Sequence, residues 1–148
     1  MLAGSAATVR PARSAFSRQA VDWDLSDSGV DFAPARQSTI AQPVSVAGPG
    51  TFLGKETRVL KFEPTDLEGW WFVRDDLADC LPVRVSVRNV WTTGDIVSNI
   101  VLRSGPPQNY VRMVEHIVAL RMGLEIDNLM IRCNSGDPPL FKRGSLDL

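Results

Sequence analysis

The hydrophobic period of this chain changes at Pro107, and that change limits the folds open to it. Residues 82–91 follow a period of two, with valines at one set of positions and arginine or serine at the other: Val83, Val85 and Val87 against Arg84, Ser86 and Arg88. A period of two is typical of a strand that buries one face. Beyond Pro107, apolar residues recur at spacings of three and four, through Tyr110, Val114, Ile117 and Val118. That spacing predicts an amphipathic helix.

Further strands are predicted on both sides of this helix. Segments with β-type apolar patterns, most of them bounded by glycine or proline, are 38–48, 57–64, 70–74, 98–103 and 127–133. In the second of these, Leu60 and Phe62 fall on the face opposite Val59 and Lys61. Several strands followed by a helix and a last strand predict the α+β class, with a mostly antiparallel sheet packed against one or two helices in two layers.

The length of 148 residues suits one folded domain with tails. Residues 1–36 have no hydrophobic period, so we expect a flexible N-terminal arm, and we place the domain at 37–148. The first twenty residues carry arginine, serine and alanine without any acidic residue, which is typical of an organellar transit peptide. A disordered tail or a misassigned start codon explains the same composition.

Several classes of function are disfavoured by composition. A net charge of −1 gives no electrostatic footprint for nucleic acid or an anionic membrane. No apolar run approaches the roughly 20 residues of a transmembrane helix. Cys80 and Cys133 are too far apart in sequence for a paired metal motif, and buried thiols are favoured over one disulfide. Trp70, Trp71 and Trp91 could form a carbohydrate or acyl-chain platform, but core residues with a polar edge are the favoured interpretation.

The single histidine, His116, follows Glu115 within the predicted helix. Taken alone, it is a structural or surface histidine at a helix turn. The motifs around it, however, resemble in content and order the first half of the UDP-3-O-acyl-N-acetylglucosamine deacetylase family, the zinc enzymes of lipid A synthesis. The resemblance covers residues 36–146 and is most specific from 114 to 128. It is carried by Gln37, Thr39, Ile40, Gly48, Gly50, Pro64, Gly69, Phe72, Arg74, Asp76, Leu77, Val114-Glu115-His116, Ala119, Gly123-Leu124, Ile126-Asp127-Asn128, Pro139 and Gly144-Ser145.

The resemblance implies a fold and a chemistry. Family members are two-domain α+β proteins with the active site between the halves, and this chain would match domain I. Glu115 would be the general base and His116 one zinc ligand. A catalytic zinc takes three protein ligands and keeps a position for water, whose proton a nearby carboxylate can remove. Neighbouring helical positions diverge by about 100°, so one side chain can hold the metal while the other approaches the water.

The other ligands are missing from this chain. In the family they come from a His-Lys-x-x-Asp motif in the second half, and a later histidine there is the general acid. Asp127, Glu125 or a cysteine are alternative ligands, but no set has suitable spacing. We therefore expect Zn²⁺ only if a complementary domain supplies the rest, and we expect the isolated chain neither to hold zinc tightly nor to deacetylate.

Three positions depart from the family pattern. The turn at residues 50–54 lacks the family's histidine. Arg143 replaces the aspartate of an Asp-Gly-Ser-Ala motif, and Arg121 stands where leucine is preferred on the helix. Burying an unpaired charge is costly, so Arg121 must reach solvent or a partner, or the local packing must differ.

Two hypotheses from different classes follow, beside a third that ignores the resemblance. In the first, Glu115 and His116 are half of a deacetylase site, completed by another domain or chain; an uncovered interdomain face would also permit a homodimer. In the second, the domain is a degenerate binding or assembly module. In the third, it is an unrelated peptide-binding or sheet-edge adaptor. Lipid A synthesis implies a bacterial cytoplasm, whereas a transit peptide implies a mitochondrion or plastid.

Overall fold

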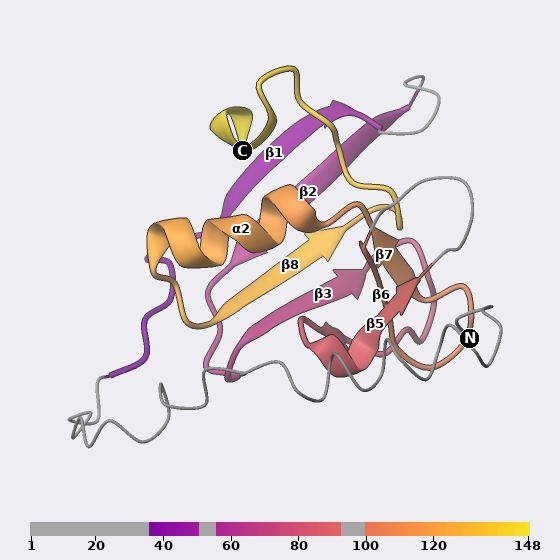
Figure 1. Ribbon diagram of the computed structural model, residues 1–148, viewed down its shortest axis with the longest axis horizontal. Coiled ribbons are helices and arrows are strands. Elements are labelled where there is room, and N and C mark those ends of the chain that lie inside the picture. Colours follow the sequence, from indigo (N-terminus) through magenta and orange to yellow (C-terminus); the bar gives the residue numbers. More distant parts are fainter. Residues whose placement is uncertain (1–35, 51–55, 93–99) are drawn as a thin grey trace, which may run out of the picture. The chain divides into compact units, whose positions relative to one another are not determined.

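A computed structural model of the chain describes residues 36–50, 56–92 and 100–148, and in these ranges the strands form two sheets (Figure 1). The predicted N-terminal arm, apart from Arg36, lies outside them. The larger sheet has the order β1-β2-β8-β3-β4, with strands β1 (Val44–Pro49), β2 (Thr57–Glu63), β8 (Leu129–Cys133), β3 (Trp70–Arg74) and β4 (Val83–Arg84). The smaller sheet consists of β5 (Val90–Thr92), β6 (Ile100–Arg103) and β7 (Tyr110–Arg112).

Every strand pairing is antiparallel except that of β3 with β8, which is parallel. The α-helix of the described ranges, α2 (Glu115–Leu124), lies between β7 and β8 in sequence, and 3₁₀ turns span η2 (Val87–Asn89) and η3 (Gly144–Asp147). The predicted α+β class is therefore confirmed. None of the described helices is both long and apolar enough to cross a membrane.

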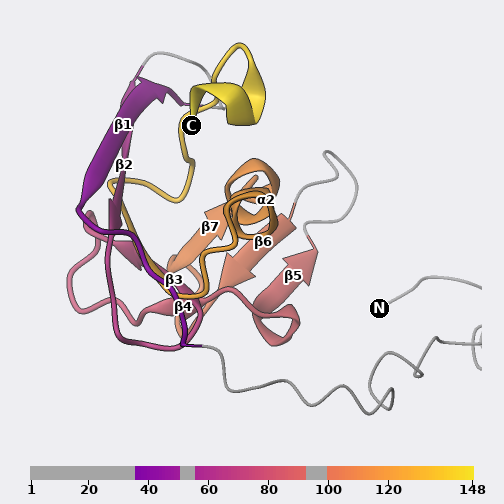
Figure 2. The same ribbon diagram turned by 90° about the vertical axis from the view of Figure 1, so that its left-hand side faces the viewer.

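The core lies where α2 and the smaller sheet meet one face of the larger sheet. Figure 2 looks along α2 and shows the helix beside both sheets. The predicted alternation in β2 is confirmed, because Leu60 and Phe62 are buried whereas Lys61 is exposed. The buried cluster unites the larger sheet, the smaller sheet and the helix, with members Leu60, Phe62, Trp70, Phe72, Val83, Leu102, Val111, Val114, Ile117, Leu129, Ile131 and Cys133.

The prediction of one strand over residues 82–91 was wrong. The chain leaves the larger sheet after Arg84, turns through η2 and enters the smaller sheet as β5. The hydroxyl of Ser86 causes the break by accepting a hydrogen bond from the main-chain N–H of Arg88, a local bond that competes with a ladder. Val87, expected on the buried face, is 88% exposed as a result.

The helix begins later than the sequence predicted. Tyr110 was assigned to it, but lies in β7 opposite Arg103 of β6. The turn before β7 is held by the buried side chain of Asn109, which donates to the carbonyls of Leu81 at 2.8 Å and Ser104 at 2.9 Å. These bonds place the residues after Asn109 beside β6. Tyr110 therefore pairs with a strand, although the spacing of the apolar residues is helical.

The interpretation of buried thiols holds for Cys133 but not for the half-buried Cys80, and the interpretation of core tryptophans holds for Trp70. Cys80 and Cys133 are free thiols, and burial raises the pKa of Cys133 to about 12. Trp70 is a core residue whose indole N–H donates to the Ile126 carbonyl at 2.8 Å. Trp91 differs, because it is 49% exposed and its ring lies under the Arg103 guanidinium, 3.6 Å from the ring centroid.

Candidate functional site

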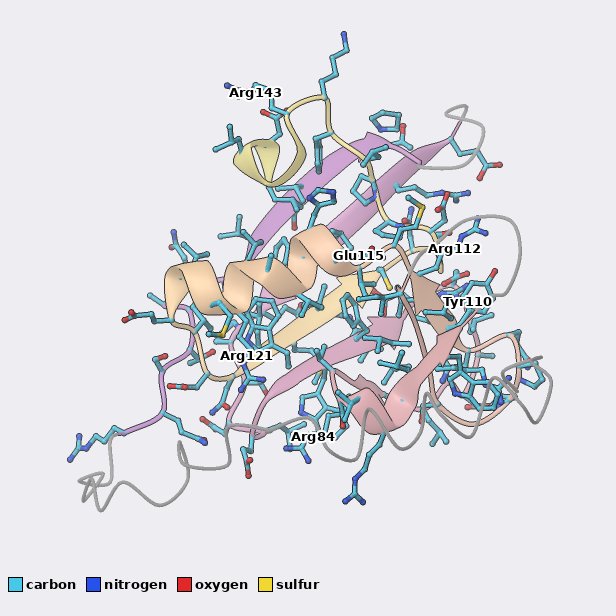
Figure 3. All side chains as sticks on the ribbon, in the orientation of Figure 1. Arg84, Tyr110, Arg112, Glu115, Arg121 and Arg143 are labelled. Atoms are coloured by element: carbon cyan, nitrogen blue, oxygen red, sulfur yellow. The ribbon has the colours of Figure 1, made fainter. Side chains whose placement is uncertain are left out.

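A pocket of about 290 Å³ opens between the start of α2 and the segment that follows β8. Glu115 and His116 both border it, so the structure brings the two predicted site residues to one place. Figure 3 shows Glu115 at the first turn of the helix. The rest of the lining is apolar apart from a glycine backbone: Met113, Ile117, Pro139, Leu140, Phe141, Gly144 and Leu148.

Glu115 is the first residue of α2 and is half-buried. Its carboxylate oxygen Oε1 accepts a hydrogen bond from the main-chain N–H of Ile100 at 2.6 Å. The positive end of the helix dipole favours a negative charge at this position. The first turn itself is fixed by Val114 and Ile117, which are 0% and 2% exposed in the core. The buried residues Val114 and Ile117 thus fix the backbone of Glu115, and the N–H of Ile100 fixes its carboxylate.

His116 is exposed and lies against the η3 turn. A Cβ atom placed on Gly144 would lie 3.5 Å from Cε1 and 3.6 Å from Nδ1 of the imidazole. Gly144 has φ +59°, a left-handed conformation that favours glycine. The backbone conformation, rather than the space beside His116, therefore favours glycine at this position, and the nearness of the turn to His116 could not be predicted from the sequence.

The motif Ile126-Asp127-Asn128 connects the start of the domain to β8. Asp127 Oδ2 accepts hydrogen bonds from the main-chain N–H of Ser38 at 2.7 Å and from its hydroxyl at 3.0 Å. These bonds lower the pKa of the Asp127 carboxyl. The side chain of Asn128 accepts from the Gly69 N–H at 2.8 Å and donates to Gln37 Oε1 at 3.0 Å. Asp127 and Asn128 therefore bind the start of the domain and the residue before β3, and neither lines the pocket beside Glu115.

Asn128→Ala is expected to lower the free energy of unfolding by about 1–3 kcal/mol, because the buried N–H of Gly69 loses its acceptor. Urea denaturation of the two proteins measures the difference. Asn134→Ala is the matched control, since its side chain also accepts a main-chain N–H, that of Val59 at 2.9 Å, but is exposed. Equal losses in both variants would contradict the structural role of Asn128.

The described residues do not make a complete zinc site. Nowhere in these ranges do three or more His, Cys, Asp or Glu side chains gather as a metal would require. Glu125 follows the last residue of α2, about 13 Å along the helix axis from His116 by the rise per residue. Asp127 lies further along the chain and is bound to Ser38. The alternative ligands named from the sequence are therefore not supported, and His116 is the one imidazole that the described residues offer.

The two arginines that depart from the family pattern are accommodated locally. Arg143, which precedes η3, pairs with Asp147 at the end of that turn. Its Nε lies 2.8 Å and a terminal nitrogen 2.6 Å from Oδ1, and these bonds lower the pKa of the Asp147 carboxyl. Arg143 does not line the pocket. Arg121 is half-buried, and its charge contributes to the lowered pKa of Asp127 (Figure 3). The departing residues 51–54 lie outside the described ranges.

The ion pair of Arg74 and Asp76 joins a buried guanidinium to a carboxylate at the surface. Arg74 is 7% exposed and binds both carboxylate oxygens of Asp76, at 2.7 and 2.6 Å. Its remaining nitrogen donates to the Tyr110 carbonyl at 2.7 Å, which ties β3 to β7. These bonds raise the pKa of Arg74 and lower that of Asp76. Both residues had been singled out by the family pattern alone, without a role.

These features define an α+β domain in which the first turn of one helix presents a carboxylate and an imidazole to an apolar pocket. The chain belongs to the UDP-3-O-acyl N-acetylglycosamine deacetylase family, whose sequence model matches residues 37–147. The resemblance drawn from the motifs is thus confirmed at the level of the family.

The curated relatives that the chain matches are longer than this chain. The chain is 34% identical over 111 residues to the UDP-3-O-acyl-N-acetylglucosamine deacetylase of a Nostoc species, an alignment that covers 72% of this chain and 36% of the relative. It is 29% identical over 110 residues to the bifunctional enzyme LpxC/FabZ of Chlorobaculum tepidum, covering 74% and 22%. For the Francisella tularensis deacetylase the identity is 26% over 113 residues, covering 76% and 38%. The chain therefore spans between 22% and 38% of the length of these relatives.

Proposed function

We propose that this chain contributes part of an N-deacetylase site, with Glu115 as the general base and His116 as one zinc ligand. The substrate class is the one in the relatives' names, a UDP-linked N-acetylglucosamine with a 3-O-acyl chain. The observation that carries the proposal is that both side chains border one pocket at the fixed first turn of α2.

The residues of the chain have distinct tasks in this proposal. Glu115 takes a proton from the water that attacks the acetamide carbonyl, and its position is set by the Ile100 N–H. Most of the other lining residues are apolar, and apolar surroundings strengthen electrostatic interactions within the pocket. A zinc ion bound with help from His116 would lower the pKa of that water toward about 7. Acetate is the leaving product.

The remaining ligands and the general acid are proposed to come from a complementary domain or chain, which corresponds to the length of the relatives that this chain does not span. Exposed leucines near the pocket, Leu140 at 43% and Leu146 at 81%, offer apolar surface for such a partner. A homodimer through the same surface is the alternative. We assign the reaction to a bacterial cytoplasm, or to an organelle if residues 1–36 act as a transit peptide.

A chimera tests the proposal. Residues 37–147 of this chain replace the aligned segment of the Nostoc deacetylase, and acetate release from the UDP-sugar is measured with zinc present. We expect turnover above that of the isolated chain, with the parent Nostoc enzyme as the reference. A chimera that folds by circular dichroism and holds zinc but releases no acetate would contradict the proposal and favour the non-catalytic binding module.

A further inference from the structure

The end of the β6–β7 ladder has an unusual acceptor. Val101 lies opposite Arg112, so the register places Ile100 opposite Met113. The N–H of Met113 donates to the Ile100 carbonyl at 2.9 Å. In a regular antiparallel ladder, the two residues of a hydrogen-bonded pair exchange both bonds. The N–H of Ile100 should therefore return to the carbonyl of Met113.

That second bond goes to a side chain instead. The N–H of Ile100 donates to Oε1 of Glu115 at 2.6 Å. Met113 has φ +51°, and this left-handed residue turns the chain out of β7 and toward α2. A carboxylate in place of a carbonyl makes a shorter and stronger hydrogen bond because it is charged. The side chain of Glu115 thus takes the acceptor position that closes the ladder.

The surrounding structure keeps this arrangement fixed. A non-glycine residue in the left-handed region is strained and persists only where its neighbours hold it. Here the Ile100 carbonyl holds Met113 from one side, and the fully buried Val114 anchors the chain on the other. The distance from the helix start to the end of β6 is therefore set by the core, and it matches the reach of a glutamate.

We propose that the main-chain N–H of Ile100 is a positioning group for the base: it fixes one oxygen of Glu115 at the end of the β6–β7 ladder and leaves the other oxygen to accept the proton. The role of Glu115 as a general base rests on the proposed function, whereas its hydrogen bond with the Ile100 N–H does not. Glu115 then has two separable roles. Glutamine can accept the Ile100 hydrogen bond but cannot act as a base, and alanine can do neither.

Nuclear magnetic resonance of the whole chain tests the contact. We expect the Ile100 amide proton to resonate downfield and to exchange slowly with solvent in the parent chain. In Glu115→Gln the resonance should move upfield while hydrogen exchange at Ile100 stays slow. In Glu115→Ala the exchange should become at least tenfold faster. An Ile100 amide whose chemical shift and exchange rate are the same in the parent chain and in both variants would overturn the proposal.

The catalytic consequence is tested in the chimera by replacing Ile100 with its α-hydroxy analogue, which exchanges the N–H for an ester oxygen. We expect kcat to fall at least tenfold while KM stays unchanged, because only the orientation of the base is lost. An unchanged kcat would overturn the positioning role even if Glu115→Gln still abolishes turnover. If neither the chimera nor its variants release acetate, while exchange at the Ile100 amide still differs between Glu115→Gln and Glu115→Ala, the proposed function is overturned and the contact is established.

Discussion

Arg74→Met is expected to lower the free energy of unfolding by about 3 kcal/mol. The substitution removes a buried guanidinium that binds Asp76 through two nitrogens and the Tyr110 carbonyl through a third. Removing one partner of a buried pair typically costs about 3–5 kcal/mol. We place this pair at the low end, because the Asp76 side chain is 34% exposed and water can replace part of the lost contact. Urea denaturation of the chain measures the loss.

Arg84→Met is the matched control. Arg84 also pairs with a carboxylate, that of Glu68 at 3.4 Å, but both side chains are exposed. Exposed pairs contribute about 0–1 kcal/mol. Similar losses in the two variants would show that the Arg74 pair gains nothing from burial and would contradict its role in joining β3 to β7.

The ion pair of Arg74 and Asp76 makes the free energy of unfolding depend on pH in the acidic range. Hydrogen bonds from Arg74 lower the folded-state pKa of Asp76 below its ordinary value of 3.8. A carboxyl with a lowered folded pKa stabilises the fold above its unfolded pKa, and the contribution is lost as pH falls through the folded value. The parent chain should therefore lose stability more steeply than Arg74→Met below about pH 4. Parallel denaturation curves at several pH values measure this difference.

Long segments with one clear period were predictable from the sequence. The strands over residues 57–63, 70–74 and 129–133 were found because their buried residues alternate and most of them are bounded by breakers, but the parallel pairing of the last two was not predicted. The break at Ser86 was missed, because the valine alternation continues across two strands of different sheets and only a short side-chain bond separates them. Tyr110 was missed because a spacing of three or four residues also occurs by chance across a strand and the helix that follows it.

The site was predictable as far as it is local in sequence. Glu115 and His116 are neighbours on a helix, so any fold that exposes the first turn of α2 brings them to the same surface. The hydrogen bond between Glu115 and the Ile100 N–H could not be predicted from the sequence, because it depends on the β6–β7 register and on the left-handed backbone of Met113. Asp127 was considered as a metal ligand because a carboxylate alone does not reveal its partner, which is Ser38, 89 residues away.

The structure gives the family's best-marked segment two different tasks. In its first part, the core residues Val114 and Ile117 flank Glu115 and His116, so packing of the helix start positions the carboxylate and the imidazole at the pocket. Its last part, Asp127 and Asn128, joins the start of the domain to the larger sheet. A motif that is continuous in sequence is therefore partly chemical in the proposed function and partly structural.

The most direct test of the account is acetate release and bound zinc, measured together on the chimera and on its Glu115→Gln and His116→Ala variants. Loss of a general base typically lowers the rate by a factor of roughly 10² to 10⁴. Glutamine at position 115 can still accept the hydrogen bond from the Ile100 N–H. We therefore predict that Glu115→Gln folds, retains zinc and loses at least about a hundredfold in kcat. His116→Ala should lose zinc together with activity. A Glu115→Gln chimera as active as its parent, or a His116→Ala chimera with undiminished zinc affinity, would contradict the assignment of these two residues.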